Sequence, residues 1–187
     1  MSVSTKVPLY KFVPKQSDTI TFDSNILIKL LYPAMCENTP ITAYIDLYAK
    51  ILAAKSSLII SSIQISEFVN RCIRFQFALY KEAQVNPNMD FKKDYRNTAD
   101  YKNSMTAILD IIQTDIIPNY TFIDDGFSCM QKDEIFRYGF SYDFNDSILY
   151  EIARQNNAIL VTDDADFANY GSKVKIVTNN SKLLMFS

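Results

Sequence analysis

Short runs of apolar residues alternate along this chain with longer stretches whose apolar positions repeat every three or four residues. The longer stretches predict helices at residues 24–32 and 40–55, from Ser62 onward, and at 101–117, 127–138 and 144–156, with a short helix or turn at 164–170. The short runs predict strands at 19–22, 58–61, 120–123, 158–162 and 173–178. Strands that are apolar throughout and alternate with helices indicate a mainly parallel sheet covered on both faces.

One polar stretch interrupts this alternation in the middle of the chain. Residues 82–100, EAQVNPNMDFKKDYRNTAD, contain Asn-Pro-Asn and have no strong apolar period. We therefore expect a loop or an inserted segment between two helices. The length of 187 residues favours one α/β domain over residues 1–187 that carries this insertion.

Composition narrows the class of protein. With 48% hydrophobic residues the chain can build a core, and only three glycines favour long helices over a loop-rich all-β fold. The three separated cysteines, Cys36, Cys72 and Cys129, indicate free thiols in a reducing compartment. The chain shows no secretory signal pattern and no apolar run near the roughly 20 residues of a membrane span. We therefore expect a cytoplasmic protein without membrane contact.

Charge and the missing histidine limit the chemistry. The net charge of −2 gives no overall attraction to nucleic acid, so any such binding must come from a local patch. The absence of histidine excludes a mechanism based on imidazole. Acidic residues are the remaining candidates for catalysis.

Acidic residues recur where predicted strands end or helices begin. The four are Asp23, Glu67, Asp146 and Asp164. Each has a structural explanation: Asp23 and either Asp143 or Asp146 can cap a helix, Glu67 can pair with Arg71, and a turn accepts an aspartate. Carboxylates beside a core are costly, however, unless a partner offsets the lost hydration, and divalent cations prefer oxygen ligands.

The last acidic group is the hardest to explain by turn chemistry. Asp163, Asp164 and Asp166 fall within four residues, and no basic residue lies between Arg154 and Lys173. These carboxylates would repel one another without a cation. Because ligands bind beyond the carboxyl ends of parallel strands, we expect a Mg²⁺ or Mn²⁺ site at that edge of the sheet.

These motifs together resemble the PIN-domain family. The resemblance depends on four segments: Asp23-Ser24-Asn25-Ile26, Ser61 to Glu67, Asn145-Asp146-Ser147-Ile148, and Leu160 to Phe167 with its Thr-Asp-Asp-Ala-Asp-Phe ending. The 18-residue step from Asp146 to Asp164 is typical of the VapC-like branch. The resemblance spans about residues 19–178.

The resemblance implies a three-layer α/β/α fold and a Mg²⁺- or Mn²⁺-dependent ribonuclease, often the toxin of a toxin–antitoxin pair. It makes RNA the substrate and an antitoxin protein the partner, and we also expect a homo-oligomer. The residues it implies are the catalytic and metal-binding acids Asp23, Glu67, Asp146 and Asp164, with Asn25 and Thr162 in support and Asp143 as the rival of Asp146.

RNA contact could come from the basic middle of the chain. Residues 71–102 hold seven basic and four acidic residues, a local charge of +3, interleaved with aromatic rings. Basic groups beside aromatic rings suit single-stranded RNA, which makes Lys92, Lys93 and Arg96 candidate RNA-binding residues. The alternative is a solvated helical hairpin or a protein contact.

Two other functions fit parts of the pattern. A catalytically inactive PIN-like module would bind RNA or protein, although all four acids are present. A receiver-type domain also has acids at strand ends, but it needs a lysine after its last strand, whereas here the paired acids come late, at Asp163 and Asp164.

Overall fold

The structure, a computed structural model, describes residues 5–36, 41–136, 144–169 and 173–185. In these residues a single sheet has six strands, all parallel, in the order β1-β6-β5-β2-β3-β4. The strands are β1 (Lys6–Pro8), β2 (Thr19–Phe22), β3 (Ser57–Ser61), β4 (Thr121–Ile123), β5 (Ile159–Val161) and β6 (Ile176–Thr178). The mainly parallel sheet predicted from the sequence is confirmed, with β1 as an additional edge strand.

Helices connect the strands and cover the sheet. They are α1 (Ser24–Leu31), α2 (Thr42–Ala54), α3 (Ser62–Ala83), α4 (Ala99–Ile111), α5 (Lys132–Ile135), α6 (Phe144–Gln155) and α7 (Ser181–Met185). Short turns of 3₁₀ type include η1 (Leu9–Lys11), η5 (Phe127–Cys129) and η6 (Ala165–Asn169), and π-type turns form η3 (Phe91–Tyr95) and η4 (Ile112–Ile116). None of the described helices is long and apolar enough to cross a membrane.

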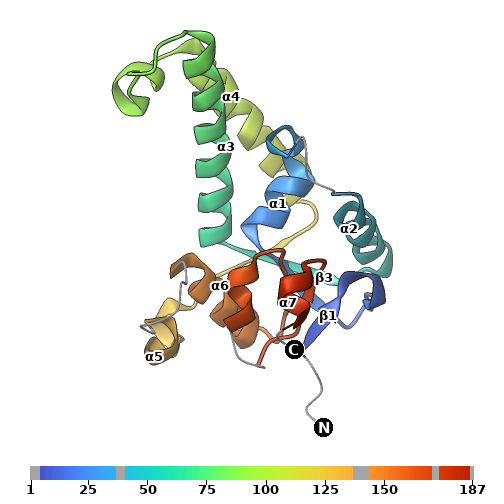
Figure 1. The fold of residues 1–187 in the computed structure, drawn as a ribbon. Helices are drawn as coiled ribbons and strands as arrows, with labels where there is room; N and C mark the ends of the chain where they lie inside the picture. The colour runs from blue at the N-terminus through green and yellow to red at the C-terminus, as the bar shows by residue number, and fades with distance from the viewer. Residues whose placement is uncertain (1–4, 37–40, 137–143, 170–172, 186–187) are drawn as a thin grey trace.

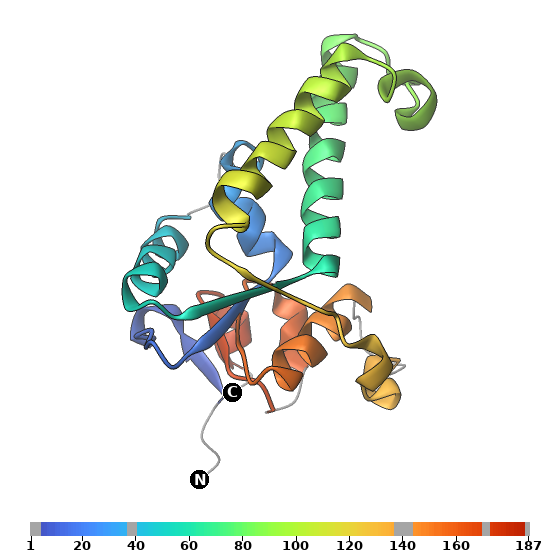
Figure 2. The ribbon, with the colours of Figure 1, turned by 180° about the vertical axis from the view of Figure 1, so that it is seen from behind.

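In β3, β5 and β6 alternate residues pack into different cores, and helices lie on both faces of the sheet in three layers (Figures 1 and 2). Leu58 and Ile60 of β3 join the core formed with α1, α2, α3 and α4, whereas Ile59 joins the core formed with α6 and α7. In β5, Ile159 and Val161 face the first core and Leu160 faces the second. This two-sided burial explains why the strands are apolar throughout and confirms the three-layer α/β/α fold.

The long helix α3 and its partner α4 project from the body as an arm, seen in Figures 1 and 2. Residues 82–100, expected as a loop or inserted segment, form the tip of this arm and are partly ordered by η3. The Asp90 carboxylate accepts the backbone N–H groups of Lys92 and Lys93, and Phe91 and Tyr95 are buried against rings from the two helices. The arm therefore has an aromatic core of its own.

The predicted helix at 127–138 is wrong as a continuous element. Its described part contains η5 and the single turn α5, separated because Met130 is extended and buries its side chain in a small core with Ile135 and Ile148. Residues 137 and 138 lie outside the described part of the chain. The last strand is shorter than predicted, and α7 follows it where no helix was expected.

Strand order brings the ends of β2 and β5 side by side. The chain runs outward from β2 to β3 and β4, and then returns to place β5 on the other side of β2. The order therefore reverses between β2 and β5, the topological switch point where open α/β sheets bind ligands. Asp23 follows β2, and Thr162 to Asp164 follow β5.

A buried glutamine fixes the start of α3 to the central strand. Gln64 Nε2 donates to Thr21 Oγ1 at 3.0 Å and to the Phe22 carbonyl at 2.6 Å, and its Oε1 accepts the Ser61 N–H at 2.9 Å. Replacing Gln64 by Ala leaves these buried groups unpaired, so we expect a loss of about 2–4 kcal/mol in the free energy of unfolding. Chemical denaturation measures this loss.

The matched control is Gln84→Ala at the exposed end of α3, which should change the free energy of unfolding by less than about 0.5 kcal/mol. Equal losses in the two variants would show that Gln64 does not anchor α3.

Candidate active site at the carboxyl edge of the sheet

Asp23 is the buried centre of the site. It follows β2 and caps α1, because its Oδ1 accepts the Asn25 N–H at 3.3 Å. Its Oδ2 accepts the Thr162 hydroxyl at 2.7 Å, and its own N–H donates to the Val161 carbonyl at 2.9 Å. The residue is only 4% exposed. The capping role considered from the sequence is therefore real, and Oδ2 still points to the end of β5.

Burial makes the charge on Asp23 costly. The pKa of this carboxyl is raised to about 6: loss of hydration is the largest cause and the charges of Asp164 and Glu67 add to it, while hydrogen bonds from Thr162 and the Asn25 N–H oppose the shift. Two of the other predicted acids, Asp164 and Glu67, thus act electrostatically on Asp23. A cation among them would relieve the repulsion and favour ionised Asp23.

The Asn25 side chain connects these acids. Its Nδ2 lies 3.5 Å from Asp23 Oδ2 and 3.4 Å from Asp164 Oδ2, and its Oδ1 accepts a hydrogen bond from Arg71. One amide thus touches a carboxylate after β2, a carboxylate after β5 and a guanidinium on α3.

The two aspartates that follow β5, Asp163 and Asp164, contact different parts of the structure. Asp164 stays at the site, where its N–H donates to Thr162 Oγ1 at 3.0 Å and its Oδ1 accepts the Asp166 N–H at 2.9 Å. Asp163 instead forms an ion pair with Lys29 of α1 and accepts the Tyr44 hydroxyl at 3.0 Å. Lys29 thus supplies the basic partner that this window of sequence lacks.

Glu67 borders the site from α3. Its Oε1 lies 3.5 Å from Arg71 Nη1, the i,i+4 pair considered from the sequence, and its side chain is 27% exposed. The same guanidinium reaches Asn25. The sequence indicated Arg71 as a partner of Glu67 and as part of the basic stretch 71–102, but not that its guanidinium would contact Asn25.

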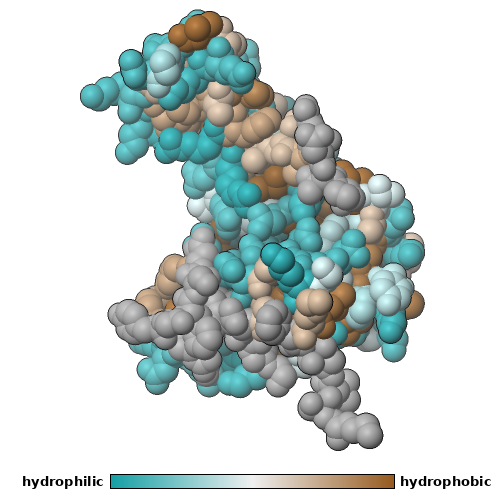
Figure 3. Space-filling model, viewed as in Figure 1, coloured by the Kyte–Doolittle hydropathy of each residue, from teal (hydrophilic) through white to brown (hydrophobic). Residues whose placement is uncertain are grey.

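Asp146 lies in the first turn of α6 and is half-buried. Helix α6 packs against the foot of α3, where Ile63 joins the small core of Ile148 and Ile152. In the space-filling view the surface is hollowed below the arm (Figure 3). Asp143 lies outside the described residues.

The donor set suits a hard cation by its chemistry, since carboxylate oxygens are the ligands that Mg²⁺ and Mn²⁺ prefer. Among the described residues, however, no three His, Cys, Asp or Glu side chains stand close enough together to hold a metal ion. Asn25 and Arg71 stand between the acids instead. Glu67, Asp146 and Asp164 are all half-buried, whereas Asp23 is buried.

The predicted RNA-binding residues lie far from the acids. Lys92, Lys93 and Arg96 are exposed at the arm's tip, and the Arg96 guanidinium lies over the Phe91 ring at 5.5 Å. Glu67 stands near the opposite end of α3, with 16 helical residues to Ala83, or about 24 Å. The fold therefore does not place this basic patch in the acidic site.

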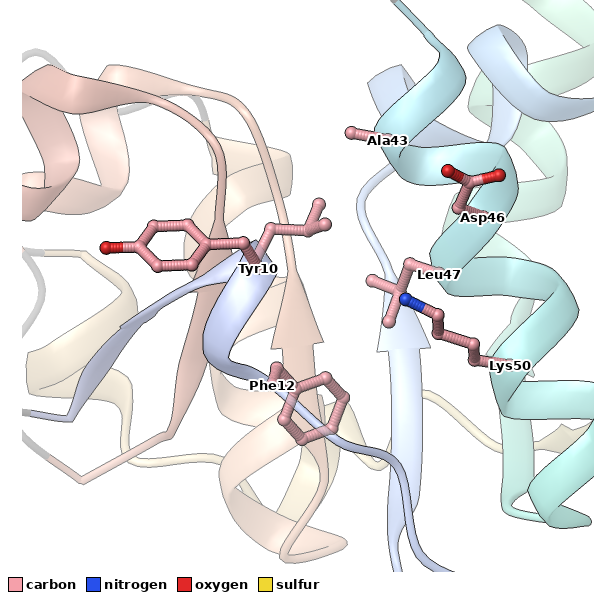
Figure 4. Close-up of a pocket in the computed structure, with 7 residues that line it drawn as sticks. Tyr10, Phe12, Ala43, Asp46, Leu47 and Lys50 are labelled. Atoms are coloured by element: carbon pink, nitrogen blue, oxygen red, sulfur yellow. The ribbon is translucent and has the colours of Figure 1, made fainter.

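A separate cavity of about 200 Å³ lies between η1 and α2 (Figure 4). None of the four predicted acids lines it; the lining residues are Leu9, Tyr10, Phe12, Ala43, Asp46, Leu47 and Lys50. It is distinct from the site at the carboxyl edge of the sheet.

Comparison with known proteins supports the fold. A solved structure, VapBC2 from Rickettsia felis bound to a DNA fragment from their promoter, contains a chain similar to this one, with a TM-score of 0.51 and 21% sequence identity. The match covers 86% of this chain and 98% of that chain. No protein-family model and no curated protein matches the sequence.

The buried charge gives a prediction for Asp23→Asn without metal. The pKa of Asp23 is about 6 in the fold against an ordinary 3.8, so its contribution to stability is full below about pH 4 and is lost as pH rises through 6. Asparagine keeps the Thr162 bond and removes the charge. At pH 8 in a chelator we expect the variant to be more stable than the parent, by at most about 3 kcal/mol.

At pH 4 this advantage should disappear, which urea denaturation at both pH values checks. The control is Asp110→Asn on the exposed surface of α4, which should show no such pH dependence. An advantage of equal size at both pH values would contradict the assigned pKa.

Proposed function

We propose that this chain is a metal-dependent endoribonuclease that hydrolyses RNA phosphodiester bonds. The observation that supports it most strongly is the buried Asp23 carboxylate at the switch point of the sheet, coupled to Asp164 and Glu67. Such a group is costly in an apoprotein and useful beside a cation. The likeness to the VapBC2 structure supports the same reading at the level of the fold.

In this proposal Asp23, Glu67, Asp146 and Asp164 hold Mg²⁺ or Mn²⁺. A metal ion held there would activate a water molecule and offset negative charge on the phosphodiester. Thr162 keeps Asp23 oriented through its hydroxyl, and the Asn25 amide positions Asp23 and Asp164 relative to each other. Arg71, which contacts Asn25 and Glu67, can neutralise part of the phosphate charge.

We further propose that an antitoxin protein controls this activity. The solved neighbour is VapBC2 bound to a promoter DNA fragment, and the motif spacing resembles the VapC-like branch. A homo-oligomer and a cytoplasmic location remain predictions of the sequence. Co-expression with the product of an adjacent small reading frame, followed by purification of the complex, tests the antitoxin.

The first functional prediction concerns metal and cleavage together. Millimolar Mg²⁺ or Mn²⁺ should raise the melting temperature, because a ligand that binds only the folded state stabilises it, and should allow cleavage of a mixed RNA pool. Asp23→Asn and Asp146→Asn should each abolish cleavage while keeping the fold. Calorimetry and gel analysis of the RNA measure the two effects.

Asp143→Asn is the control for Asp146, because family spacing assigns the ligand role to Asp146. It should retain activity and cost at most about 1–2 kcal/mol of stability. Loss of cleavage in Asp143→Asn alone would exchange the two roles. A parent protein that binds RNA without cleaving it in any metal would favour the inactive RNA-binding module.

The second functional prediction concerns the arm. We propose that Lys92, Lys93 and Arg96 contact RNA phosphates, and their distance from the acids means that only a strand of several nucleotides can reach both places. Replacing all three by Ala should weaken binding of a 20-nucleotide RNA. The slope of log affinity against log salt concentration should become shallower by about 0.7 for each phosphate contact that is lost. Cleavage of a very short RNA should not change.

The control variant replaces Lys50, Lys55 and Lys175, three exposed lysines of the body, by Ala. It removes the same charge and should leave the salt slope of the parent. If the arm variant keeps its RNA affinity but loses a protein partner or changes its mass in light scattering, the arm is a protein contact instead.

A further inference from the structure

Basic side chains follow one face of α3, the helix that runs from the candidate site to the tip of the arm (Figure 1). Arg71, Arg74 and Lys81 stand three and seven residues apart, so they lie on the same side of the helix, and Glu67 begins the same row. Arg74 is exposed and lies about 10 Å from Glu67 along the helix axis. A cationic row therefore starts beside the acids and leads outward along the arm.

The η3 turn brings a second guanidinium to Arg74. The Arg74 guanidinium carbon lies 3.8 Å from the centre of the Phe91 ring, and that of Arg96 lies 5.5 Å from the same centre. The two carbons are therefore no more than about 9.3 Å apart, the sum of these distances. Phe91 is only 8% exposed and packs edge-on against Phe77. One covered ring thus holds two exposed cations near each other.

The acids of the arm do not neutralise this pair of arginines. Asp90 and Asp94 accept backbone N–H groups at and beside η3, and Asp100 accepts a tyrosine hydroxyl at 2.7 Å. Within the described part of the chain, neither Arg74 nor Arg96 forms an ion pair. The carboxylates are used to fold the arm, and the guanidinium N–H donors remain available to an anion from outside.

We propose that Arg74 and Arg96 bind two phosphates of one nucleic-acid strand. The site deepens the proposed contact of the arm with RNA by adding Arg74 as a binding residue and Phe91 as the residue that positions both cations. The direction of the strand, along the α3 row toward the acids, rests on the proposed function. The phosphate site itself rests on the contacts described above.

The chemistry of the site favours a phosphodiester backbone. A guanidinium presents a planar fork of donors that matches phosphate oxygens, and two forks held at this spacing suit phosphates of one strand. Residues 71–102 carry +3 in a chain of −2, so the remaining residues carry −5 and repel a polyanion that the arm attracts. A peptide partner would also bury apolar surface, whereas the ring between the two arginines is already covered.

The experiment measures binding of a fluorescent 12-nucleotide single-stranded RNA by anisotropy, in a chelator and over a range of salt concentrations. Arg74→Gln and Arg96→Gln should each weaken binding by about 3- to 10-fold. Each should also make the slope of log affinity against log salt concentration shallower by about 0.7. Single-stranded DNA of the same length should behave like the RNA, because the contacts are to phosphate.

Two further variants separate the site from general charge. Lys11→Gln is the matched control, since Lys11 is exposed on η1 with its Nζ 5.7 Å from the centre of the Tyr10 ring. It removes one cation held over a ring and should keep the parent affinity and slope. Arg74→Lys keeps the charge and loses the fork, so it should keep the slope and still weaken binding. Melting temperatures confirm that every variant is folded.

Equal affinity and slope in Arg74→Gln and Lys11→Gln would overturn the site. So would tighter binding of a 12-residue polyglutamate than of RNA with the same loss in Arg74→Gln, because the ligand would then be an acidic peptide. Cleavage is assayed separately with Mg²⁺ or Mn²⁺. Cleavage by the parent with no effect of Arg74→Gln on binding removes the phosphate site alone, and Arg74-dependent binding without cleavage removes the nuclease alone. A parent that binds neither RNA nor DNA at low salt overturns the site.

Discussion

The burial of one carboxylate is the constraint on which the rest of this structure depends. Asp23 ends the central strand, starts α1 and is almost inaccessible to water. Its carboxylate accepts the hydroxyl of Thr162, which follows β5, and the backbone N–H of Asn25 at the start of α1. Because β5 lies beside β2 only through the reversal of strand order, the sheet topology and the site are one arrangement.

Basic side chains on α1 and α3 contact different acidic residues, and some of these acids are structural while others lie at the candidate site. Lys29 takes Asp163, which also accepts the Tyr44 hydroxyl, so this carboxylate holds α1 and α2 to the end of β5. Asp164, its neighbour in sequence, turns the other way, toward Asn25 and Asp23. Arg71 reaches Asn25 and Glu67 from α3. Neighbouring acids with different partners can therefore have different roles.

The arm and the body are stabilised in different ways. The body buries both faces of a sheet, whereas the arm buries aromatic rings between two helices and the η3 turn. The rings that made the arm attractive as a stacking surface are its core: Tyr95 is fully buried and Phe91 nearly so. Exposed aromatic surface lies instead on Phe136 and Phe144, which stack on each other between α5 and α6.

Local pattern was sufficient to predict the central strands, most helices and the placement of Asp23 and Asp164 at strand ends, because apolar runs and caps act over a few residues. The Glu67–Arg71 pair followed from helical spacing. Other features depend on residues far apart in the chain. The three-residue β1 gains strand character only by pairing with β6, Lys29 meets Asp163 across 134 positions, and Arg71 meets Asn25 across 46. Tertiary packing alone decided these, since no local period records which distant side chains will meet.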